Sequence, residues 1–435
     1  MPTEASIKTN PTGDHGREPG PLPASEHGAG QEPTSQRLKP SEIRLLALAS
    51  AVVTANAYYI HPIIARVAED FGVSAAMIGA VPSLNQLALA VGIFLLLPLG
   101  DRFSNRRLVS IFVTAQFLSI SLMAIASEYW LFVAGSTLLG FFTIAPYLLP
   151  AYVSKRVEAS RLGAVTAVLT TGIIAGILVA RVGAGILGEY LGWRTVYYLA
   201  AALMLAVSFM LPLIMDGREG GRRDGPRESY FGLIFSLPAV IAKFPEILLS
   251  GAIQGLSFGI FLSVWLGLGL HLTSDDMGYG VDIVGYLAGF TLLNLIVTPR
   301  LGAWADRTGA RRARAIVAAV QLSGASLLYV FGHSLWLLMI PIVIMNLAGP
   351  VIDITGRMTF LSQDSDVRTR LMTAYIMMMF IGGGVASWAG TAAYDLAGWS
   401  GNAILALVMS FTVLSLALAA LRYGGADAPQ AASGD

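Results

Sequence analysis

The sequence predicts an all-α membrane protein whose twelve transmembrane helices form two six-helix pseudo-repeats. Three observations predict this fold class: the composition, a series of long uncharged stretches, and two matching charged segments about 205 residues apart. Of the 435 residues, 55% are hydrophobic and 13% are charged, whereas soluble domains average about 25% charged residues. The lipid bilayer is therefore the expected solvent for most of the chain.

The chain has enough uncharged sequence for twelve spans, each of which needs about 20 apolar residues to cross the hydrocarbon core. The stretch 315–352 is long enough for two spans, with Gly332-His333-Ser334 as the turn between them. A shorter apolar run, 230–242, is expected to lie along the membrane surface. The stretches free of Asp, Glu, Lys and Arg are 45–65, 71–100, 108–127, 129–154, 162–180, 195–215, 247–274, 283–299, 315–352, 371–394 and 396–421.

Two charged segments mark the repeat. In each, an Asp-Arg pair is separated by three residues from an Arg-Arg pair, and the second segment opens with a glycine. Since six spans per repeat is an even number, both repeats have one orientation and are related by an axis along the membrane normal, as in many secondary transporters. The segments consist of Asp101, Arg102, Arg106 and Arg107, and of Gly302, Asp306, Arg307, Arg311 and Arg312.

The repeats and the polar segments around them divide the chain into five parts. Residues 1–42 are rich in Pro, Gly, Ser and Glu and are expected to form a disordered cytoplasmic tail. Residues 43–215 and 247–422 are the two six-helix bundles. Residues 216–246 are a cytoplasmic linker with an interfacial helix, and 423–435 form a second cytoplasmic tail.

Charge sets the orientation in the membrane. With a cytoplasmic N-terminus, 25 of the 28 Lys and Arg residues lie in cytoplasmic segments, Arg66 and Arg194 lie outside, and Arg181 lies within the fifth span. Cytoplasmic loops of membrane proteins carry an excess of Lys and Arg. Both termini are therefore expected in the cytoplasm.

Composition also excludes several classes of function. A net charge of +1 gives no basic face for nucleic acid. The chain has no cysteine, so it forms no disulfide and no thiolate metal site. It has no nucleotide-binding or cofactor fingerprint and no zinc-binding HExxH sequence. Neither a cofactor, a resident metal nor an enzymatic activity is expected.

The two charged segments resemble the signature loops of the major facilitator superfamily. Residues 56–62, 98–102 and 192–194, together with Arg370 and Tyr375, are similar to bacterial members near the drug:proton antiporter branch. The resemblance covers about 43–423 and implies the twelve-span major facilitator fold in the cell inner membrane. It also implies that the signature loops latch the two halves together when the central cavity opens outward. One chain contains both halves, so a monomer is expected.

Three departures from the branch bear on the function. Leu97 replaces the first glycine of the signature, although Gly302 keeps it in the second copy. The fourth span has no charge, whereas drug:proton antiporters carry an arginine there. Ala180-Arg181 stands where the antiporter motif of the fifth span has Gly-Pro. These departures favour an alternative within transport, an importer or facilitator of a small metabolite.

Ionisable residues inside a membrane are candidates for function because they are costly to bury. Asp353 and Arg357 have the spacing of an intrahelical ion pair, and Asp353 is alternatively a proton-carrying carboxylate. Arg181 is expected to meet Asp282 at the outer start of the eighth span. That contact would be a structural pair or an outer gate, and recognition of an anionic solute is the third reading of Arg181.

In the major facilitator fold, spans 1, 4, 7 and 10 line the central cavity, and spans 2 and 11 contribute to it. Their uncharged polar and aromatic residues are the candidates for solute binding, although each is as readily explained by hydrogen bonds or packing between helices. The candidates are Asn56, Tyr59, Gln86, Phe142, Tyr147, Gln254, Trp265, Asn346 and Tyr375.

The sequence thus predicts a secondary active transporter that exports a small organic compound or drug in exchange for protons by alternating access. An importer or facilitator is the alternative. A membrane sensor that transports nothing is the rival from another class, supported by the long N-terminal tail. Deletion of residues 1–40 distinguishes them, since a transporter should keep its activity and a tail-driven sensor should lose it.

Overall fold

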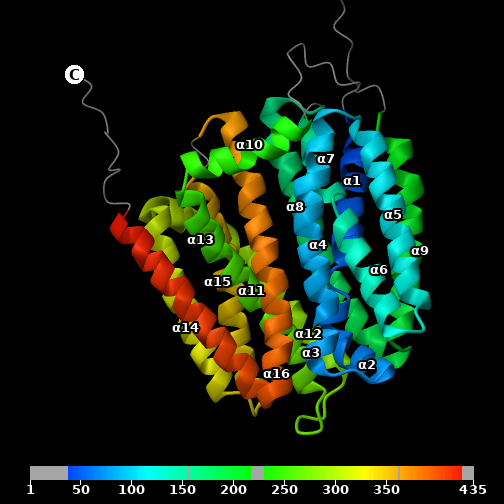
Figure 1. Cartoon of the computed structure of the whole chain (residues 1–435), viewed down its shortest axis with the longest axis vertical. Helices are drawn as coiled ribbons and strands as arrows, with labels where there is room; N and C mark the ends of the chain where they lie inside the picture. Colours follow the sequence, from blue (N-terminus) through cyan, green and yellow to red (C-terminus); the bar gives the residue numbers. More distant parts are fainter. Residues whose placement is uncertain (1–37, 155, 217–229, 361–362, 424–435) are drawn as a thin grey trace, which may run out of the picture. The chain divides into compact units, whose positions relative to one another are not determined.

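The computed structural model describes residues 38–154, 156–216, 230–360 and 363–423. Most of the two predicted tails therefore lies outside the described residues. The described chain is built of helices, as Figure 1 shows.

The helices before residue 216 form the first half of the molecule. Several predicted spans consist of two pieces joined by a short break, which lets the chain change direction without leaving the bundle. The helices are α1 Pro40–Ala55, α2 Ile60–Phe71, α3 Ala75–Ile78, α4 Ala80–Leu96, η1 Leu97–Asp101, α5 Asn105–Ile125, α6 Tyr129–Phe142, α7 Ala145–Ser154, α8 Ala159–Tyr190 and α9 Trp193–Ile214.

The second half follows a short helix, α10, that lies across one end of the bundle (Figure 1). The Tyr230 hydroxyl on α10 donates a hydrogen bond to the carbonyl oxygen of Leu95, at 2.6 Å. The helices from here on are α10 Tyr230–Lys243, α11 Glu246–Leu272, α12 Val281–Ala288, η2 Gly289–Thr291, α13 Leu292–Thr308, α14 Ala310–Val330, α15 Leu335–Met358 and α16 Ser365–Tyr423.

The helix lengths agree with twelve spans. Within the described residues, ten helices are long and apolar enough to cross a membrane. One further pair of segments, Val281–Asn294 and Ile296–Thr308, is bent by 42° near the start of α13. One of the ten, α16, is broken by non-helical backbone at Ala397 and Gly398 and so accounts for two spans. The stretch 315–352 holds two helices, because α14 ends at Val330 and α15 begins at Leu335.

The fifth span is longer than its uncharged stretch. The fifth, predicted at 162–180, is α8 and continues to Tyr190. Charged side chains at Arg181 and Glu189 do not end a helix, because the helix backbone satisfies its own polar groups whatever the side chain is. The helix stops before Gly192, whose φ of 83° favours glycine.

The two halves touch closely at the end of the molecule remote from the signature loops, which we call the opposite end. Here α8 packs against α12: a methyl group on Gly185 would lie 2.8 Å from the Val281 carbonyl oxygen and 2.9 Å from the Cα of Gly285. Glycines let the two backbones approach at this distance. The amide of Ala75 also donates to the Asp395 carboxylate across the halves, at 3.2 Å.

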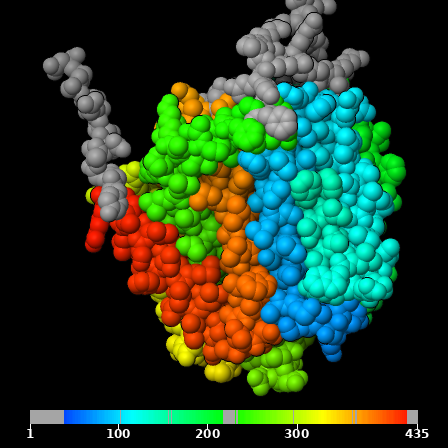
Figure 2. Space-filling view, in the orientation of Figure 1, coloured from blue at the N-terminus to red at the C-terminus, as the bar shows by residue number. Residues whose placement is uncertain are grey.

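The packing differs toward the end that carries the signature loops, which we call the signature end. A methyl group on Gly163 in α8 would have no atom within 4 Å, and one on Gly302 in α13 would meet only Ile354, at 3.9 Å. Between the two ends, α4 and α16 run side by side along one face (Figure 2). The halves are thus closed together at the opposite end and along α4 and α16, whereas a methyl group on Gly163 or Gly302 at the signature end would touch no atom of the other half.

The contact of Gly185 with Gly285 predicts a way to shift this state. We expect Gly185→Leu to drive α8 and α12 apart at the opposite end, since the new side chain has no room there. The chain has no cysteine, so cysteines can replace the exposed Tyr190 and Tyr279 as the only sites for spin labels. Double electron–electron resonance then measures the distance between the two labels. The distribution should move to longer distances.

Gly163→Leu is the matched control for this experiment. Its side chain enters open space in the same helix, so the distance distribution should stay as in the wild type. A Gly185→Leu distribution that coincides with the wild type would contradict the assignment of this contact as the closure between the halves.

Candidate functional site: a cavity in the second half and its surroundings

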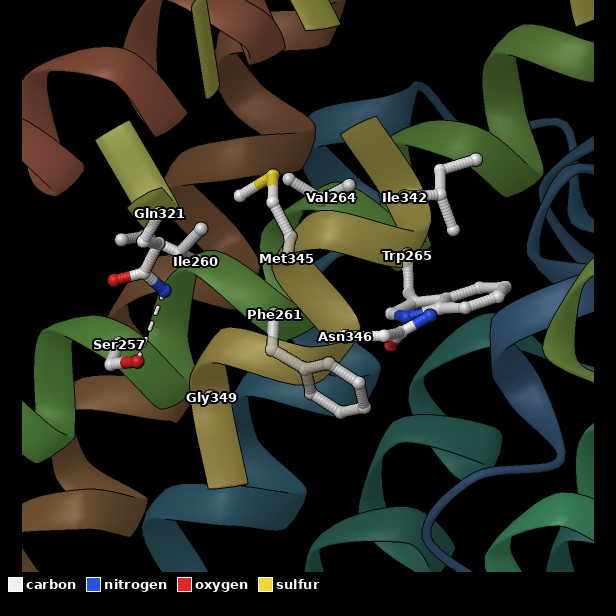
Figure 3. A pocket seen from close by; sticks show the side chains of 10 residues that line it. All are labelled: Ser257, Ile260, Phe261, Val264, Trp265, Gln321, Ile342, Met345, Asn346 and Gly349. Carbon is white, nitrogen blue, oxygen red and sulfur yellow. Dashed lines mark hydrogen bonds between the residues drawn. The ribbon is translucent and has the colours of Figure 1, made fainter. Parts of the chain in front are cut away.

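The described cavity lies among α11, α14 and α15 of the second half and has a volume of about 20 Å³, which is room for about one water molecule. Figure 3 shows the hydrogen bond from Gln321 to Ser257, 3.1 Å long, on one side of it. Phe261, Trp265 and Asn346 lie on the other side. Two of the nine residues predicted for solute binding, Trp265 and Asn346, therefore line this cavity.

Four of the predicted residues are buried amides with an unpaired polar atom. The side-chain nitrogen of Asn346 and both polar atoms of Asn56 have no hydrogen-bond partner within the described part of the chain. The same holds there for the side-chain oxygens of Gln86 and Gln254. A buried polar atom without a partner costs about 1–3 kcal/mol. A solute that supplied the missing partner would recover this cost.

The break in the first span explains the position of Asn56. Helix α1 ends at Ala55 and α2 begins at Ile60, so residues 56–59 form a turn inside the bundle. Tyr59 is buried on this turn. Broken helices free polar groups at the depth of the membrane, which is where transporters bind their solutes.

An aromatic series runs from the first half into the second. Tyr147 contacts Phe380 with ring centroids 6.3 Å apart, and Phe380 contacts Phe258 at 5.8 Å. Phe258 leads to Phe261 at 6.0 Å and from there to Trp265 at 6.5 Å. Sequence analysis missed the phenylalanines, although the spacing 258, 261, 265 puts three rings on one face of a helix.

Phe142 and Tyr375 have other surroundings. The Phe142 ring stacks on Phe112 within the first half, at 6.3 Å, and does not line the described cavity. The Tyr375 side chain is buried, and its hydroxyl donates to the carbonyl oxygen of Asp353, at 3.1 Å. Tyr375 therefore ties α16 to the turn of α15 that carries the acid.

Asp353 and Arg357 form an ion pair within α15. The Nε of Arg357 donates to both carboxylate oxygens of Asp353, at 2.9 and 3.0 Å. The two side chains are 26% and 33% exposed, so the pair is neither sealed in the core nor fully in solvent. Helix spacing of four residues places the two groups one turn apart, which explains the local pairing.

The expected contact between Arg181 and Asp282 is wrong. Because α8 continues to Tyr190, the acid that reaches the start of α12 is Glu189, whose carboxylate accepts a hydrogen bond from the Val281 amide, at 3.0 Å. Arg181 lies eight residues earlier in α8, which is about 12 Å along the helix. The prediction that the fifth and eighth spans are neighbours is confirmed. The predicted alignment of α8 along α12 is wrong by about eight residues, because Glu189 and not Arg181 lies at the start of α12.

Arg181 instead lies in a buried cluster of rings. Its Nη2 donates to Nδ1 of His61, at 2.9 Å. Its guanidinium carbon is 4.6 Å from the ring centroids of both Phe261 and Trp265, and 5.2 Å from that of Tyr58. Arg181 is 1% exposed. Since Phe261 and Trp265 belong to the second half, these cation–π contacts join the halves.

His271, in the last turn of α11, contacts the turn between α14 and α15. Its Nε2 lies 2.7 Å from the carbonyl oxygen of Gly332, and its ring stacks on Trp399 with centroids 4.8 Å apart. The indole nitrogen of Trp399 donates to the Leu328 carbonyl oxygen, at 2.9 Å. These contacts fix the turn between α14 and α15.

The signature loops lie at the signature end of each half. In the first, Ser104 begins α5 and accepts a hydrogen bond from the Arg107 amide; Arg102, Arg106 and Arg107 are exposed. In the second, Arg311 pairs with Glu246 of α11, at 2.7 Å, within the second half. Asp306, Arg307 and Arg312 are solvent-exposed or partly so. The Asp101 side chain falls outside the described part of the structure.

Curated relatives of the chain are transporters by name. The chain is 27% identical over 382 residues to the "Putative uncharacterized transporter YgaY" of Escherichia coli. The matched region spans 86% of this chain and 95% of that protein. It is 29% identical over 409 residues to the "Probable transporter SCO4007" of Streptomyces coelicolor, covering 91% of this chain and 93% of that protein.

Solved structures share the fold at low identity. A bacterial homologue of the human lysosomal transporter Spinster, in an inward-facing and unoccupied conformation, matches 90% of this chain and 98% of its own with a TM-score of 0.71 and 12% identity. A mutant of the nucleoside transporter NupG matches 88% and 99% with a TM-score of 0.69 and 14% identity. The family model of the Major Facilitator Superfamily matches residues 46–311, more than half of the sequence. The chain therefore belongs to the Major Facilitator Superfamily and is a membrane transporter of this type.

Proposed function

We propose that the protein exports a small organic solute in exchange for protons, by alternating access in which its two halves rock against each other. The observation that carries the proposal is the Asp353–Arg357 pair. Asp353 lies about 7 Å inside the signature end of α15, at 1.5 Å per residue. An ionisable group at such a depth is a candidate for a proton or ion pathway.

Partial exposure lets Asp353 exchange protons, since its side chain is 26% exposed. Protonation neutralises the carboxylate and releases Arg357 from the pair. The same turn of α15 accepts the hydrogen bond of Tyr375 from α16. Proton binding therefore acts where α15 meets the helix that packs along α4 of the other half.

We assign the signature end to the cytoplasm. The arginines of both signature loops, together with Arg368 and Arg370, lie in the loops that join the spans at this end. Cytoplasmic loops of membrane proteins carry an excess of Lys and Arg. The closed opposite end then faces outward, and the state described here accepts a solute from the cytoplasm. Rocking of the halves about their contact carries the solute to the other side.

A metabolite importer or facilitator is the second candidate. The uncharged fourth span favours it. So does a relative whose name gives a sugar as its solute: the "D-xylose transporter" of Levilactobacillus brevis is 27% identical over 145 residues, 32% of this chain and 30% of that protein. An importer would lower resistance to toxic solutes that it carries inward, whereas an exporter would raise it.

The orientation predicts a labelling pattern. Because the chain has no cysteine, single cysteines at Phe103, in the first signature loop, and at Tyr279, near the start of α12, are the only sites for a thiol reagent. A membrane-impermeant maleimide added to intact cells should label Tyr279→Cys and spare Phe103→Cys. Broken cells should allow labelling of both. The reverse pattern in intact cells would overturn the orientation.

Export predicts resistance that depends on the signature loop. In an efflux-deficient bacterium, expression of the wild type should raise the inhibitory concentration of some members of a broad drug panel, and Asp101→Asn should abolish the rise. Greater sensitivity to members of the panel, or no change to any, would favour the importer.

Proton exchange predicts a separate effect of Asp353. In inside-out vesicles that hold a pH gradient, the solute found by the panel should release protons through the wild type. Asp353→Asn should reduce this release at least about tenfold, because it removes the proton-binding group. Proton release at the wild-type rate would exclude Asp353 as the coupling residue.

A stability measurement separates coupling from folding. Arg357→Gln should lower the free energy of unfolding by about 1–2 kcal/mol, because it leaves the half-buried Asp353 charge without a partner. The double variant Asp353→Asn/Arg357→Gln should recover most of the loss, since two neutral amides need no counter-charge. Thermal unfolding in detergent measures both. Equal losses in the single and double variants would contradict this role of the pair.

A further inference from the structure

The cluster around Arg181 contains hydrogen-bond donors that lack acceptors. Arginine can only donate, so the 2.9 Å contact of its Nη2 requires His61 to accept at Nδ1. The His61 proton is then on Nε2, the other ring nitrogen. Within the described residues, this Nε2 and the Nε and Nη1 of Arg181 have no hydrogen-bond partner. Two adjacent buried side chains thus hold three donors without an acceptor.

The charge of the cluster is also unbalanced. No carboxylate of the described residues lies within ion-pair distance of Arg181, which is 1% exposed. Asp353 and Arg357 neutralise each other on α15. A buried charge without a partner costs several kcal/mol, and cation–π contacts return only about 2 kcal/mol or more when desolvated. One negative charge would complete the cluster.

The cluster lies directly behind the cavity. Phe261 and Trp265 line the cavity and also lie against the Arg181 guanidinium, 4.6 Å from each ring centroid. The same two rings therefore separate the cavity from the guanidinium. An organic solute would need these rings to move, and their movement would expose Arg181 to it.

We propose that Arg181 and His61 bind the carboxylate of an organic monoanion, whose apolar body lies along the aromatic series from Trp265 to Phe380. This inference rests on the proposed function and names its solute class. A carboxylate accepts a charge-assisted hydrogen bond from Nε or Nη1 of the guanidinium. The imidazole donates a second bond from Nε2 once its ring turns away from Arg181. One arginine and a neutral histidine balance one negative charge, so a dianion is a poorer match.

Binding of the anion would also act on the gate. The carboxylate takes the place of the Phe261 and Trp265 rings at Arg181, and these rings are contacts between the halves. Loss of their cation–π contacts weakens closure at the opposite end. The solute itself thereby favours the state that releases it on that side.

The test measures binding of defined probes to the purified full chain in detergent by isothermal titration calorimetry. The probes are acetate, benzoate and 1-naphthoate, each compared with its neutral amide. At least one carboxylate should bind more tightly than its amide, and Arg181→Gln should weaken it about tenfold or more, the effect of losing one charge-assisted hydrogen bond. Arg181→Lys should retain part of the affinity, because the charge remains.

Arg314→Gln is the matched control. Arg314 is also fully buried with two unpaired nitrogens in the described structure, but it bonds Ser250 on α11, at 3.0 Å, and lies outside the proposed site. This variant should bind the carboxylates as the wild type does. A purely structural Arg181 would lower the melting temperature when replaced by Gln, whereas a binding residue should leave the melting temperature of the unliganded protein equal or higher.

Two results would overturn the proposal: no carboxylate binds more tightly than its amide, or Arg181→Gln binds as tightly as the wild type. Either result leaves export by proton exchange intact, because the drug panel and the vesicle assay detect transport of a solute whatever its charge. Conversely, carboxylate binding without proton release would retain the anion site and remove the proposed exchange.

Discussion

Close contact between helix backbones at the opposite end is the constraint on which the rest of the structure depends. Gly185 of α8 and Gly285 of α12 let the halves approach until a single methyl group would collide with backbone atoms. That approach buries Arg181 under the rings of α11 and closes the cavity on one side. Lipid gives helices no hydrophobic reason to associate, so fit between small residues has to hold this interface together.

Breaks in the helices place polar and irregular segments inside the bundle. The turn at 56–59 carries the buried Asn56 and Tyr59, and the eighth span bends by 42° near the start of α13. Inside a bilayer such breaks persist only where neighbouring protein or a water-filled space satisfies the freed backbone. The same irregularities that complicate the helices therefore position the site.

The sequence predicted the fold well because its two signals, uncharged length and repeated charge, are local. It predicted the pairing of Asp353 with Arg357 for the same reason, since one helical turn fixes that distance. It failed for Arg181, because the partner of a buried arginine depends on where α8 ends and how it registers with α12. The absence of charge from 162–180 does not define that end; Gly192 does. Contacts across the halves, such as Phe261 with Arg181, depend on tertiary packing and leave no local pattern.

The apolar core of the first half is not confined to that half. It includes Leu262, Leu266 and Leu270 of α11 and Phe380 of α16, all from the second repeat. Gene duplication gives two copies that can at first exist independently, but side chains shared in this way make each copy the scaffold of the other. A half expressed alone would expose these leucines, which in the whole chain are buried in the other half. The two halves are therefore expected to fold as one unit rather than as separate domains.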